Sequence, residues 1–301
     1  MEKSVLRKNV DFRITKMLHD LMKNQKANDL ALYLSSFDLF NPVSLAVPLW
    51  FEGPQPNFYG VPKASALPFQ IGKLVGDTRK GGSCNFSQVT LIPHCNGTHT
   101  ECVGHITHER ISLNKCLKDV FIKAILISVF PEKASEIKET YPVLEKEDSL
   151  ITKSSLKNAL EKLSLDEKSN ELPLAKALII RTLPNDSSKQ SQIYLEETPP
   201  FFSIEAISYI REQGFNHLIV DLPSIDRMRD EGKLLNHRIF WNVEEGSFEI
   251  SPKTQIHNTI TELAYISDEV EDGEYLLNLQ ITAFELEVSS SRPIIFRKIQ
   301  A

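Results

Sequence analysis

Four of the eight histidines fall close together in this chain, at positions 94, 99, 105 and 108. Two cysteines and a glutamate stand among them, in the segment Cys95-Asn-Gly-Thr-His-Thr-Glu-Cys-Val-Gly-His105. Imidazole, thiolate and carboxylate are the ligands that divalent transition metals prefer. Because one short segment seldom supplies a complete set of ligands, the fold must bring further ligands from elsewhere in the chain. The cluster favours metal binding or catalysis over a purely structural role.

The spacing of these residues selects some of them. In an extended segment successive side chains alternate between two sides, which places His94 on the side opposite to four potential ligands. The four that share one side are Cys95, His99, Glu101 and His105. Full extension would separate the first and last of them by about 33 Å, whereas metal ligands lie about 2.0–2.3 Å from the ion. The segment must therefore curl, and Gly97 and Gly104 are where φ is least restricted.

The other histidines are interpreted as ordinary packed or surface residues, which is the usual role of an isolated histidine. These are His19, His108, His217 and His257. The four cysteines, at positions 84, 95, 102 and 116, lie in one short region. In a reducing compartment such clustering favours metal or thiol chemistry over disulfides, with buried inert cysteine as the alternative.

Charge and hydropathy exclude several classes of protein. The chain has 301 residues with 34 Lys+Arg against 40 Asp+Glu, a formal net charge of -6. A nucleic-acid partner needs a concentrated basic face, and no basic run is present. The N-terminal region has no apolar stretch of signal-peptide type, and no segment approaches the roughly 20 apolar residues that span a bilayer. We therefore expect a cytoplasmic protein with no nucleic-acid or membrane partner.

The order of the predicted elements indicates one α/β domain with a mixed sheet, preceded by an added helical arm. Residues 1–41 form the predicted arm, and residues 42–301 form the domain. Short apolar runs predict strands, and apolar residues at helical spacing, together with caps, predict helices. The predicted strands cover 43–49, 88–92, 120–129, 177–181, 217–222, 275–284 and 293–296, and the predicted helices cover 154–163 and 203–213.

The histidine-rich segment resembles the signature of the metal-dependent cyclase family, which includes bacterial kynurenine formamidases and isatin hydrolases. That signature reads His-x-Gly-Thr-His-x-Asp-x-Pro-x-His. Aligned on Gly97-Thr98-His99, the chain keeps the spacing and departs at three positions, with Cys95 for the first histidine, Glu101 for aspartate and Val103 for proline. The resemblance extends from residue 42 to the end and implies the family's swivelling β/β/α fold, with helices flanking a mixed sheet.

The resemblance also implies a set of metal ligands. Cys95, His99 and Glu101 would bind one metal. A second would be surrounded by Glu101, which could bridge, and by His105, His237 and Glu262. The last two are the positions to which the family's later histidine and glutamate map. Cysteine is softer than imidazole, so its presence tilts the expected metal toward zinc and away from manganese.

The activity that the resemblance implies is hydrolysis of a small cyclic or aryl amide, as by an arylformamidase of tryptophan catabolism or a lactam hydrolase. A metal lowers the pKa of bound water from 15.7 toward about 7, and His105 and Glu262 are the candidate proton-transfer residues. Trp50 and Phe51, with Phe58 and Tyr59 nearby, are interpreted as the wall of a substrate pocket or, equally well, as core. Family members are commonly homodimers or larger homo-oligomers, and we expect the same of this chain.

Two other functions fit the same residues. Cys95 or Cys102 would be the nucleophile of a thiol enzyme, beside His99 or His105. Such an enzyme survives metal removal and is inactivated by alkylation, whereas the metal hydrolase behaves in the opposite way. Alternatively, the chain is a non-catalytic member of the family that binds a metabolite or a partner. The departures Cys95 and Glu101 from the family signature keep this possibility open.

Overall fold

The computed structural model describes residues 31–163 and 175–299. The predicted helical arm 1–41 lies mostly outside the described residues, and so does His19. In the part of the arm that is described, residues 31–35 are helical. No helix within the described ranges is long and apolar enough to cross a membrane.

The chain forms two compact units, Met1–Pro42 with Phe296–Ala301, and Val43–Ile295. In the first unit the backbone of Phe37 pairs antiparallel with Lys298. The N–H of Asp38 also donates to the carbonyl of Arg297 at 2.9 Å.

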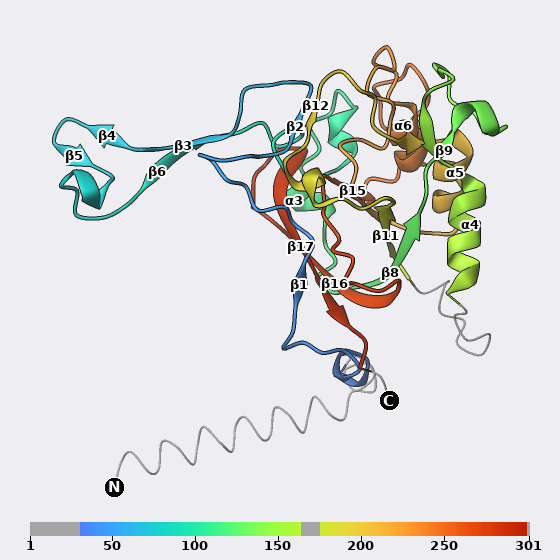
Figure 1. Cartoon of the computed structure of the whole chain (residues 1–301), viewed down its shortest axis with the longest axis horizontal. Helices are drawn as coiled ribbons and strands as arrows, with labels where there is room; N and C mark the ends of the chain where they lie inside the picture. Colours follow the sequence, from blue (N-terminus) through green and yellow to red (C-terminus); the bar gives the residue numbers. More distant parts are fainter. Residues whose placement is uncertain (1–30, 164–174, 300–301) are drawn as a thin grey trace, which may run out of the picture. The chain divides into compact units, whose positions relative to one another are not determined.

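A closed ring of seven strands forms the centre of the second unit. Figure 1 labels most of these strands. Four of them are parallel neighbours, in the order β8 (Ile122–Val129), β11 (Ala177–Thr182), β14 (His217–Val220) and β15 (Thr259–Glu262). β16 (Gly273–Ile281) pairs antiparallel with β8 and neighbours β17 (Val288–Arg297). The short strand β7 (His99–Glu101) closes the ring, because it pairs antiparallel with both β15 and β17. The prediction of a mixed α/β sheet is confirmed.

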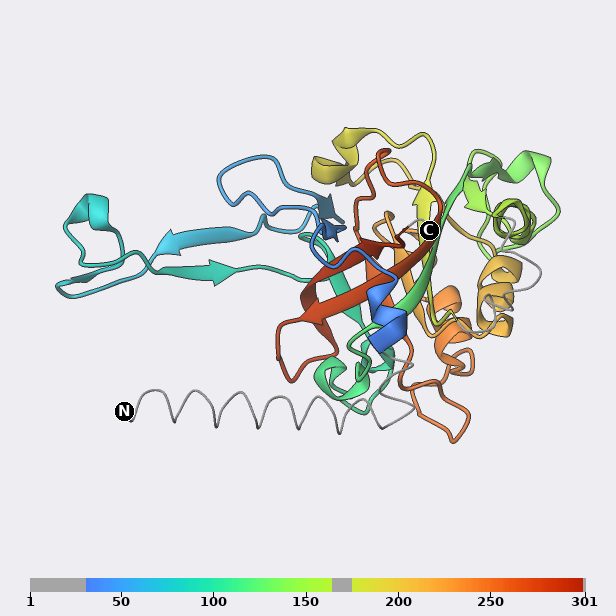
Figure 2. The same cartoon turned by 90° about the horizontal axis from the view of Figure 1, so that it is seen from below.

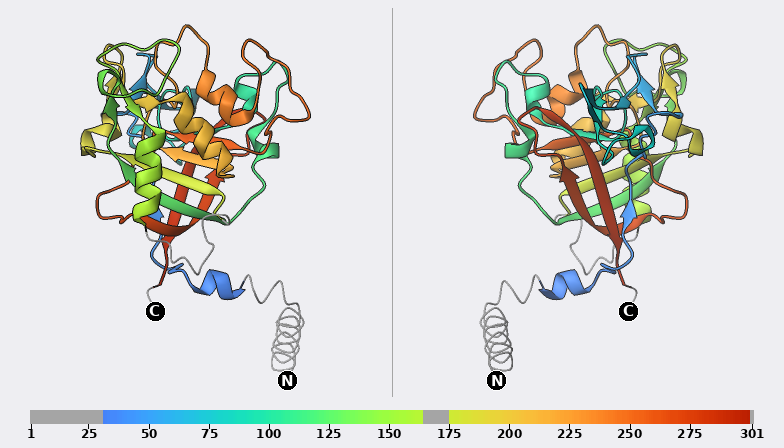
Figure 3. Two further views of the ribbon diagram at one scale, coloured as in Figure 1. Left: turned by 90° about the vertical axis from the view of Figure 1, so that its right-hand side faces the viewer. Right: turned by 90° about the vertical axis from the view of Figure 1, so that its left-hand side faces the viewer.

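Alternation along the strands divides their side chains between two apolar layers. In β8, Ile125 and Ile127 pack in one layer, whereas Leu126 packs in the other. Three helices contribute to the layer of Ile125, and Figure 3 shows α4 and α5 over that face. The helices are α4 (Lys153–Lys162), α5 (Ile204–Glu212) and α6 (Leu235–Trp241). The first two confirm the predicted helices, and Ser203 caps α5 by accepting from the N–H of Ala206 at 3.0 Å.

The remaining elements are short. Three strands form a small second sheet, β9 (Glu132–Lys133), β10 (Ser149–Ile151) and β13 (Phe201–Phe202). β2 (Asn57–Phe58) pairs with β12 (Ile193–Tyr194). The last helices are α3 (Leu113–Cys116) and the 3-10 turns η1 (Thr78–Lys80), η2 (Val103–His105), η3 (Ala134–Glu136) and η5 (Ser187–Ser191).

Two predicted strands differ from the observed ones. The predicted strand 43–49 is β1 (Val43–Ser44), which pairs with β17, followed by a single bridge from Ala46 to Ala264. The predicted strand 88–92 belongs to a hairpin, in which β6 (Ser87–Thr90) pairs with β3 (Ser65–Pro68) and β4 (Gln70–Ile71) pairs with β5 (Leu74–Val75). Figure 2 shows this hairpin extending away from the ring of strands. Its Leu67 and Val89 are exposed, so these strands pair without a buried face.

Thr98, the threonine of the Gly-Thr-His sequence, hydrogen-bonds the segment before β7 to Val47 and to Leu263. Its hydroxyl donates to the carbonyl of Leu263 at 2.6 Å and accepts from the N–H of Val47 at 2.9 Å. Leu263 directly follows Glu262 and has a left-handed φ of 52°. Side-chain bonds from a buried hydroxyl therefore hold the end of β15 in a conformation that is unfavourable for leucine.

We predict that Thr98→Val lowers the free energy of unfolding by about 2 kcal/mol. The substitution keeps the shape of the side chain but leaves a buried N–H and a buried carbonyl without this partner. Urea denaturation followed by circular dichroism measures the change. Thr90→Val, at an exposed position of β6, is the matched control and should change stability by less than about 0.5 kcal/mol. Equal stability of the two variants would contradict a structural role for the Thr98 hydroxyl.

Candidate metal centre

The histidine-rich segment has three local conformations. Residues 93–97 form a turn, in which the N–H groups of Cys95 and Asn96 both donate to the carbonyl of Ile92, at 2.9 and 3.0 Å. β7 and the 3-10 turn η2 follow. Gly97 lies in the turn with a positive φ of 142°, which favours glycine, as predicted. At Gly104 the reason for glycine is space, because a Cβ there would lie 2.3 Å from the carbonyl oxygen of Ile111.

Because the turn is not extended, the alternation of side chains does not hold before β7. The prediction that His94 faces away from the site was therefore wrong. His94 Nδ1 lies 3.0 Å from Glu101 Oε2, and the rings of His94 and His105 are 4.3 Å apart. Within β7, His99 and Glu101 share one side as predicted, and both are buried.

Glu101 lies at the centre of the cluster. Its Oε1 is 2.8 Å from His237 Nε2, and its Oε2 is 3.9 Å from His105 Nε2. Burial by itself raises the pKa of this carboxyl, but the facing His105 and His237 outweigh burial and hold the pKa well below its usual range. Glu101 is thus an ionised, buried carboxylate whose two oxygens face different histidines, which is the geometry that a bridging ligand needs.

His237 is held between two carboxylates. Its Nδ1 bonds to Asp226 Oδ2, and its Nε2 faces Glu101. Burial lowers the pKa of His237, yet Glu101 and Asp226 together raise it well above its ordinary value. Asp226 is itself fixed by the hydroxyl of Tyr141 at 2.7 Å and by the N–H of Asn236 at 2.7 Å. This carboxylate–histidine arrangement orients the ring and directs Nε2 into the cluster.

His99 and Glu262 face each other across the β7–β15 pair, in which they are register partners. Glu262 Oε2 lies 3.4 Å from His99 Nε2, and Glu262 Oε1 accepts from the N–H of Ile225 at 2.9 Å. His99 Nδ1 is 3.0 Å from the carbonyl of Gly97, which leaves Nε2 as the nitrogen with the lone pair. That buried Nε2 has no hydrogen-bond partner among the described residues.

Five of the clustered residues form two groups suited to a metal ion. His94, His99 and Glu101 make one group, and Glu101, His105 and His237 make the other, with the ligand atoms of each group within 4.8 Å of one another. The two groups share Glu101. A buried imidazole nitrogen without a hydrogen-bond partner and an ionised carboxylate between histidines are what a metal site requires. The residues that are present therefore fit one or two divalent metals.

Cys95 belongs to neither group. It packs with Phe58, Tyr194, Met228 and Leu263 in a small apolar cluster. Burial, together with the nearby Glu262, raises the pKa of the Cys95 thiol to about 11. Its ligation of a metal stays a prediction, and the geometry of the described residues favours His94 for the same role.

The four aromatic residues of the predicted pocket wall lie in different environments. Trp50 is 67% exposed, and Phe51 is half-buried in the same loop. Phe58 packs beside Cys95, and the Tyr59 hydroxyl donates to the carbonyl of Met228 at 2.7 Å. Contact of Trp50 and Phe51 with a substrate stays a prediction.

The described histidines outside the cluster have ordinary partners. His108 stacks on Phe248, His217 is buried against Thr259, and His257 lies 3.1 Å from the carbonyl of Cys116. The described cysteines are all free, and Cys102 and Cys116 share a buried apolar cluster.

Two residues of the centre escaped the sequence argument. His94 was set aside because alternation was extended into a turn. Asp226 lies in the loop that follows β14, and its position eleven residues before the candidate ligand His237 was the only available signal. Its partnership with His237 depends on the position of α6.

Comparison with known proteins agrees with this geometry. The sequence profile of a family described as putative cyclase matches residues 37–227, well over half of the chain. The chain belongs to this cyclase family. The matched range contains His94 to His105 and Asp226, whereas His237 and Glu262 lie beyond it. No curated protein matches.

Several solved structures share the fold. Isatin hydrolase A from Labrenzia aggregata, bound to benzyl benzoate, is 11% identical with a TM-score of 0.57, covering 91% of this chain and 100% of its own. Isatin hydrolase A from Ralstonia solanacearum is 13% identical with a TM-score of 0.54, covering 90% of this chain and 96% of its own. A predicted metal-dependent hydrolase from Bacillus stearothermophilus is 15% identical with a TM-score of 0.51, covering 85% and 98%. At these identities the likeness shows a common fold.

We predict that Asp226→Asn weakens metal binding roughly 10- to 100-fold, the usual effect of removing a carboxylate that orients a histidine ligand. Titration of the metal-free protein with zinc against a chromophoric chelator measures the affinity. Asp186→Asn, at the exposed start of η5, is the control and should bind zinc as the wild type does. Wild-type affinity in Asp226→Asn would contradict the orienting role.

Proposed function

We propose that this cyclase-family protein is a metal-dependent hydrolase of a small cyclic or aryl amide. The observation that carries the proposal is the buried Glu101, shared between two groups of imidazole ligands. Membership of the cyclase family and the common fold with isatin hydrolases support it. Hydrolysis here adds water to the amide carbonyl, breaks the C–N bond, and leaves a carboxylic acid and an amine.

The proposed ligands are the members of the two groups together with Glu262. His94, His99 and Glu101 would hold one metal, and Glu101, His105, His237 and Glu262 would surround the other. When bound, such a metal polarises the carbonyl and makes water nucleophilic near neutral pH. The preference for zinc that Cys95 suggested has less geometric support, since Cys95 lies outside both groups. Imidazole and carboxylate ligands suit zinc and manganese, and we retain zinc as the proposed ion.

The residues of the chain would divide the remaining work. His105 is the proposed base in a centre that holds only the ion of the first group, where its imidazole is not a ligand. Its side chain is 26% exposed, so water or a substrate can reach it. Burial and the neighbouring His94 and His237 lower its pKa to about 4, even though Glu101 acts in the opposite direction, so the ring is neutral and weakly basic at pH 7. Glu262 is held by the N–H of Ile225 and lies 3.6 Å from His237 Nε2. Glu262 is the second proposed proton-transfer residue of the site.

The thiol enzyme is less well supported. A thiol acts as a nucleophile only in its thiolate form. The pKa of Cys95 is raised to about 11 by burial, and the pKa of Cys102 is raised by the neighbouring Cys116 thiol and by burial. Both groups would be protonated at neutral pH. Metal analysis of the purified protein tests the non-catalytic alternative.

A cytoplasmic location and assembly into a homodimer or larger homo-oligomer complete the proposal. The exposed apolar side chains of the hairpin, among them Leu67, Ile71 and Val89, support association, because exposed apolar patches mark interaction sites. Light scattering of the purified protein tests the assembly.

We predict that the protein purified without added metal carries one or two equivalents, and that chelation abolishes hydrolysis of an aryl formamide or of isatin. Activity should return with zinc and should survive iodoacetamide. His99→Ala and His94→Ala should each lower the metal content, because each removes a ligand from the first group. Metal content is measured by mass spectrometry, and hydrolysis by absorbance.

Cys95→Ala is the control variant for these two histidines. It should keep its metal, since the thiol lies outside both groups. Loss of metal in Cys95→Ala together with full metal content in His94→Ala would reverse the assignment of the first ligand. A metal-free wild type would favour the non-catalytic alternative, and activity that survives chelation but not alkylation would establish the thiol enzyme.

A further inference from the structure

His94 lies between two carboxylates. Its Nδ1 is 3.0 Å from Glu101 Oε2, and its Nε2 is 3.5 Å from Glu287 Oε1. His237 is placed in the same way, with Glu101 at one ring nitrogen and Asp226 at the other. Asp226 orients the ring of His237, whereas the proposed function gives Glu287 no role.

The two ring nitrogens of His94 face different surroundings. Ligands that lie about 2.0–2.3 Å from one zinc ion, at tetrahedral angles, are roughly 3–4 Å from each other. The 3.0 Å between His94 Nδ1 and Glu101 Oε2 fits this spacing, and both residues belong to the first ligand group. Glu287, which faces Nε2, belongs to neither group. Nδ1 is therefore the nitrogen of His94 that faces the first metal position.

A histidine that coordinates a metal through Nδ1 keeps its proton on Nε2, because neutral imidazole has one N–H group and one lone pair. The Nε2 atom of His94 is buried, and no described residue completes a hydrogen bond with it. A buried N–H group needs an acceptor, and the Glu287 carboxylate is the one that faces it, at 3.5 Å. An approach of about 0.5 Å would give an N–H···O hydrogen bond of ordinary length.

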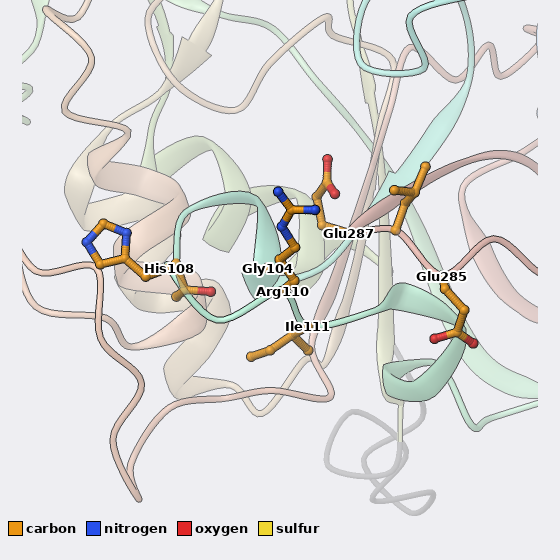
Figure 4. A pocket seen from close by; sticks show the side chains of 8 residues that line it. Gly104, His108, Arg110, Ile111, Glu285 and Glu287 are labelled. Carbon is orange, nitrogen blue, oxygen red and sulfur yellow. The ribbon is translucent and has the colours of Figure 1, made fainter.

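Backbone pairing places Glu287 for this contact. Its carbonyl accepts from the N–H of Cys102 at 3.0 Å, and the next residue, Val288, is the register partner of Glu101. Figure 4 shows the Glu287 side chain directed away from that of Glu285, two residues earlier. The strand pairing that positions the central carboxylate of the cluster thus also positions the second carboxylate beside His94.

We propose that Glu287 is a positioning residue of the metal centre, which accepts the Nε2–H of His94 and so directs Nδ1 to the first metal position. A carboxylate at the outer nitrogen fixes the tautomer and the orientation of a histidine ligand. His94 depends on such support because it lies in a turn and its side chain is 23% exposed, whereas those of His99 and His237 are buried. The inference rests on the metal site of the proposed function.

Competition with a chromophoric chelator measures how tightly the full-length protein binds zinc. Glu287→Ala should weaken zinc binding at the first metal position roughly 10- to 100-fold, the usual effect of losing a carboxylate behind a histidine ligand. Glu287→Gln keeps an acceptor oxygen but loses the charge, so its affinity should fall between those of the wild type and Glu287→Ala. Glu285→Ala is the matched control, because Glu285 is exposed and paired with Lys115 at 2.9 Å. It should bind zinc as the wild type does.

A double-mutant cycle with His94 tests whether Glu287 acts through this histidine. His94→Ala should itself weaken zinc binding. Adding Glu287→Ala to it should change the affinity by less than about 2-fold, because the ring that Glu287 positions is no longer there. A further loss of about 10-fold in the double variant would mean that Glu287 contacts the ion or stabilises the fold directly, and would overturn the positioning role.

Nitrogen-15 NMR of the histidine rings in the zinc-loaded protein identifies the coordinating nitrogen directly. The signals of His94 are those missing from His94→Ala. In the wild type we expect Nδ1 to be bound to the ion and Nε2 to carry a proton that exchanges slowly with water. The same proton should exchange faster in Glu287→Ala, because its acceptor is lost. Coordination of the ion through Nε2 of His94 would overturn the inference.

Activity then separates the inference from the proposed function. Glu287-dependent zinc binding without hydrolysis of isatin or of formanilide, an aryl formamide, would support the inference and overturn the hydrolase. Zinc-dependent hydrolysis together with wild-type zinc affinity in Glu287→Ala would overturn the inference and keep the hydrolase. A wild type that binds no zinc would overturn both.

Discussion

The double pairing of the three-residue strand β7, with β15 on one side and β17 on the other, is the constraint on which the site depends. It closes the ring of strands and at the same time places Glu101 opposite Ile260, on the side of the sheet that the helices cover. The pairing with β15 brings Glu262 opposite His99, and the residues just before β17 place Glu287 beside His94. The same short strand thus closes the ring and positions the candidate metal ligands.

A buried ionised carboxylate requires compensation, because removing a charge from water costs several kcal/mol unless it is paired. Glu101 is 1% exposed and is compensated by histidines from a turn, a 3-10 helix and α6. Asp226 in turn orients His237 from the loop after β14. Positive charge supplied by a metal would complete this compensation, which explains why the residues fit a metal better than they fit an ordinary core.

The departures from the family signature have unequal consequences. At position 101 the carboxylate of the longer glutamate still lies within 4 Å of His94, His105 and His237, so a glutamate can take the place of the aspartate. At position 95 the thiol packs among apolar side chains, and the imidazole one residue earlier occupies the cluster. The turn at residues 93–97 makes this shift possible, because it directs neighbouring side chains in ways that an extended strand cannot.

The sequence alone determined what depends on local pattern and on ligand chemistry. The apolar runs of β8, β11 and β14, the capped helix α5, and the candidate ligands His99, Glu101 and His105 follow from the periodicity and from the residue types. Tertiary structure decided the rest. The strand β15, which carries Glu262, has four residues of which two are threonines, so no apolar run predicted it. The place of His94 depended on a turn, and the partnership of Asp226 with His237 on how α6 packs. These are contacts between residues distant in the chain, and their geometry is set by packing that no local pattern encodes.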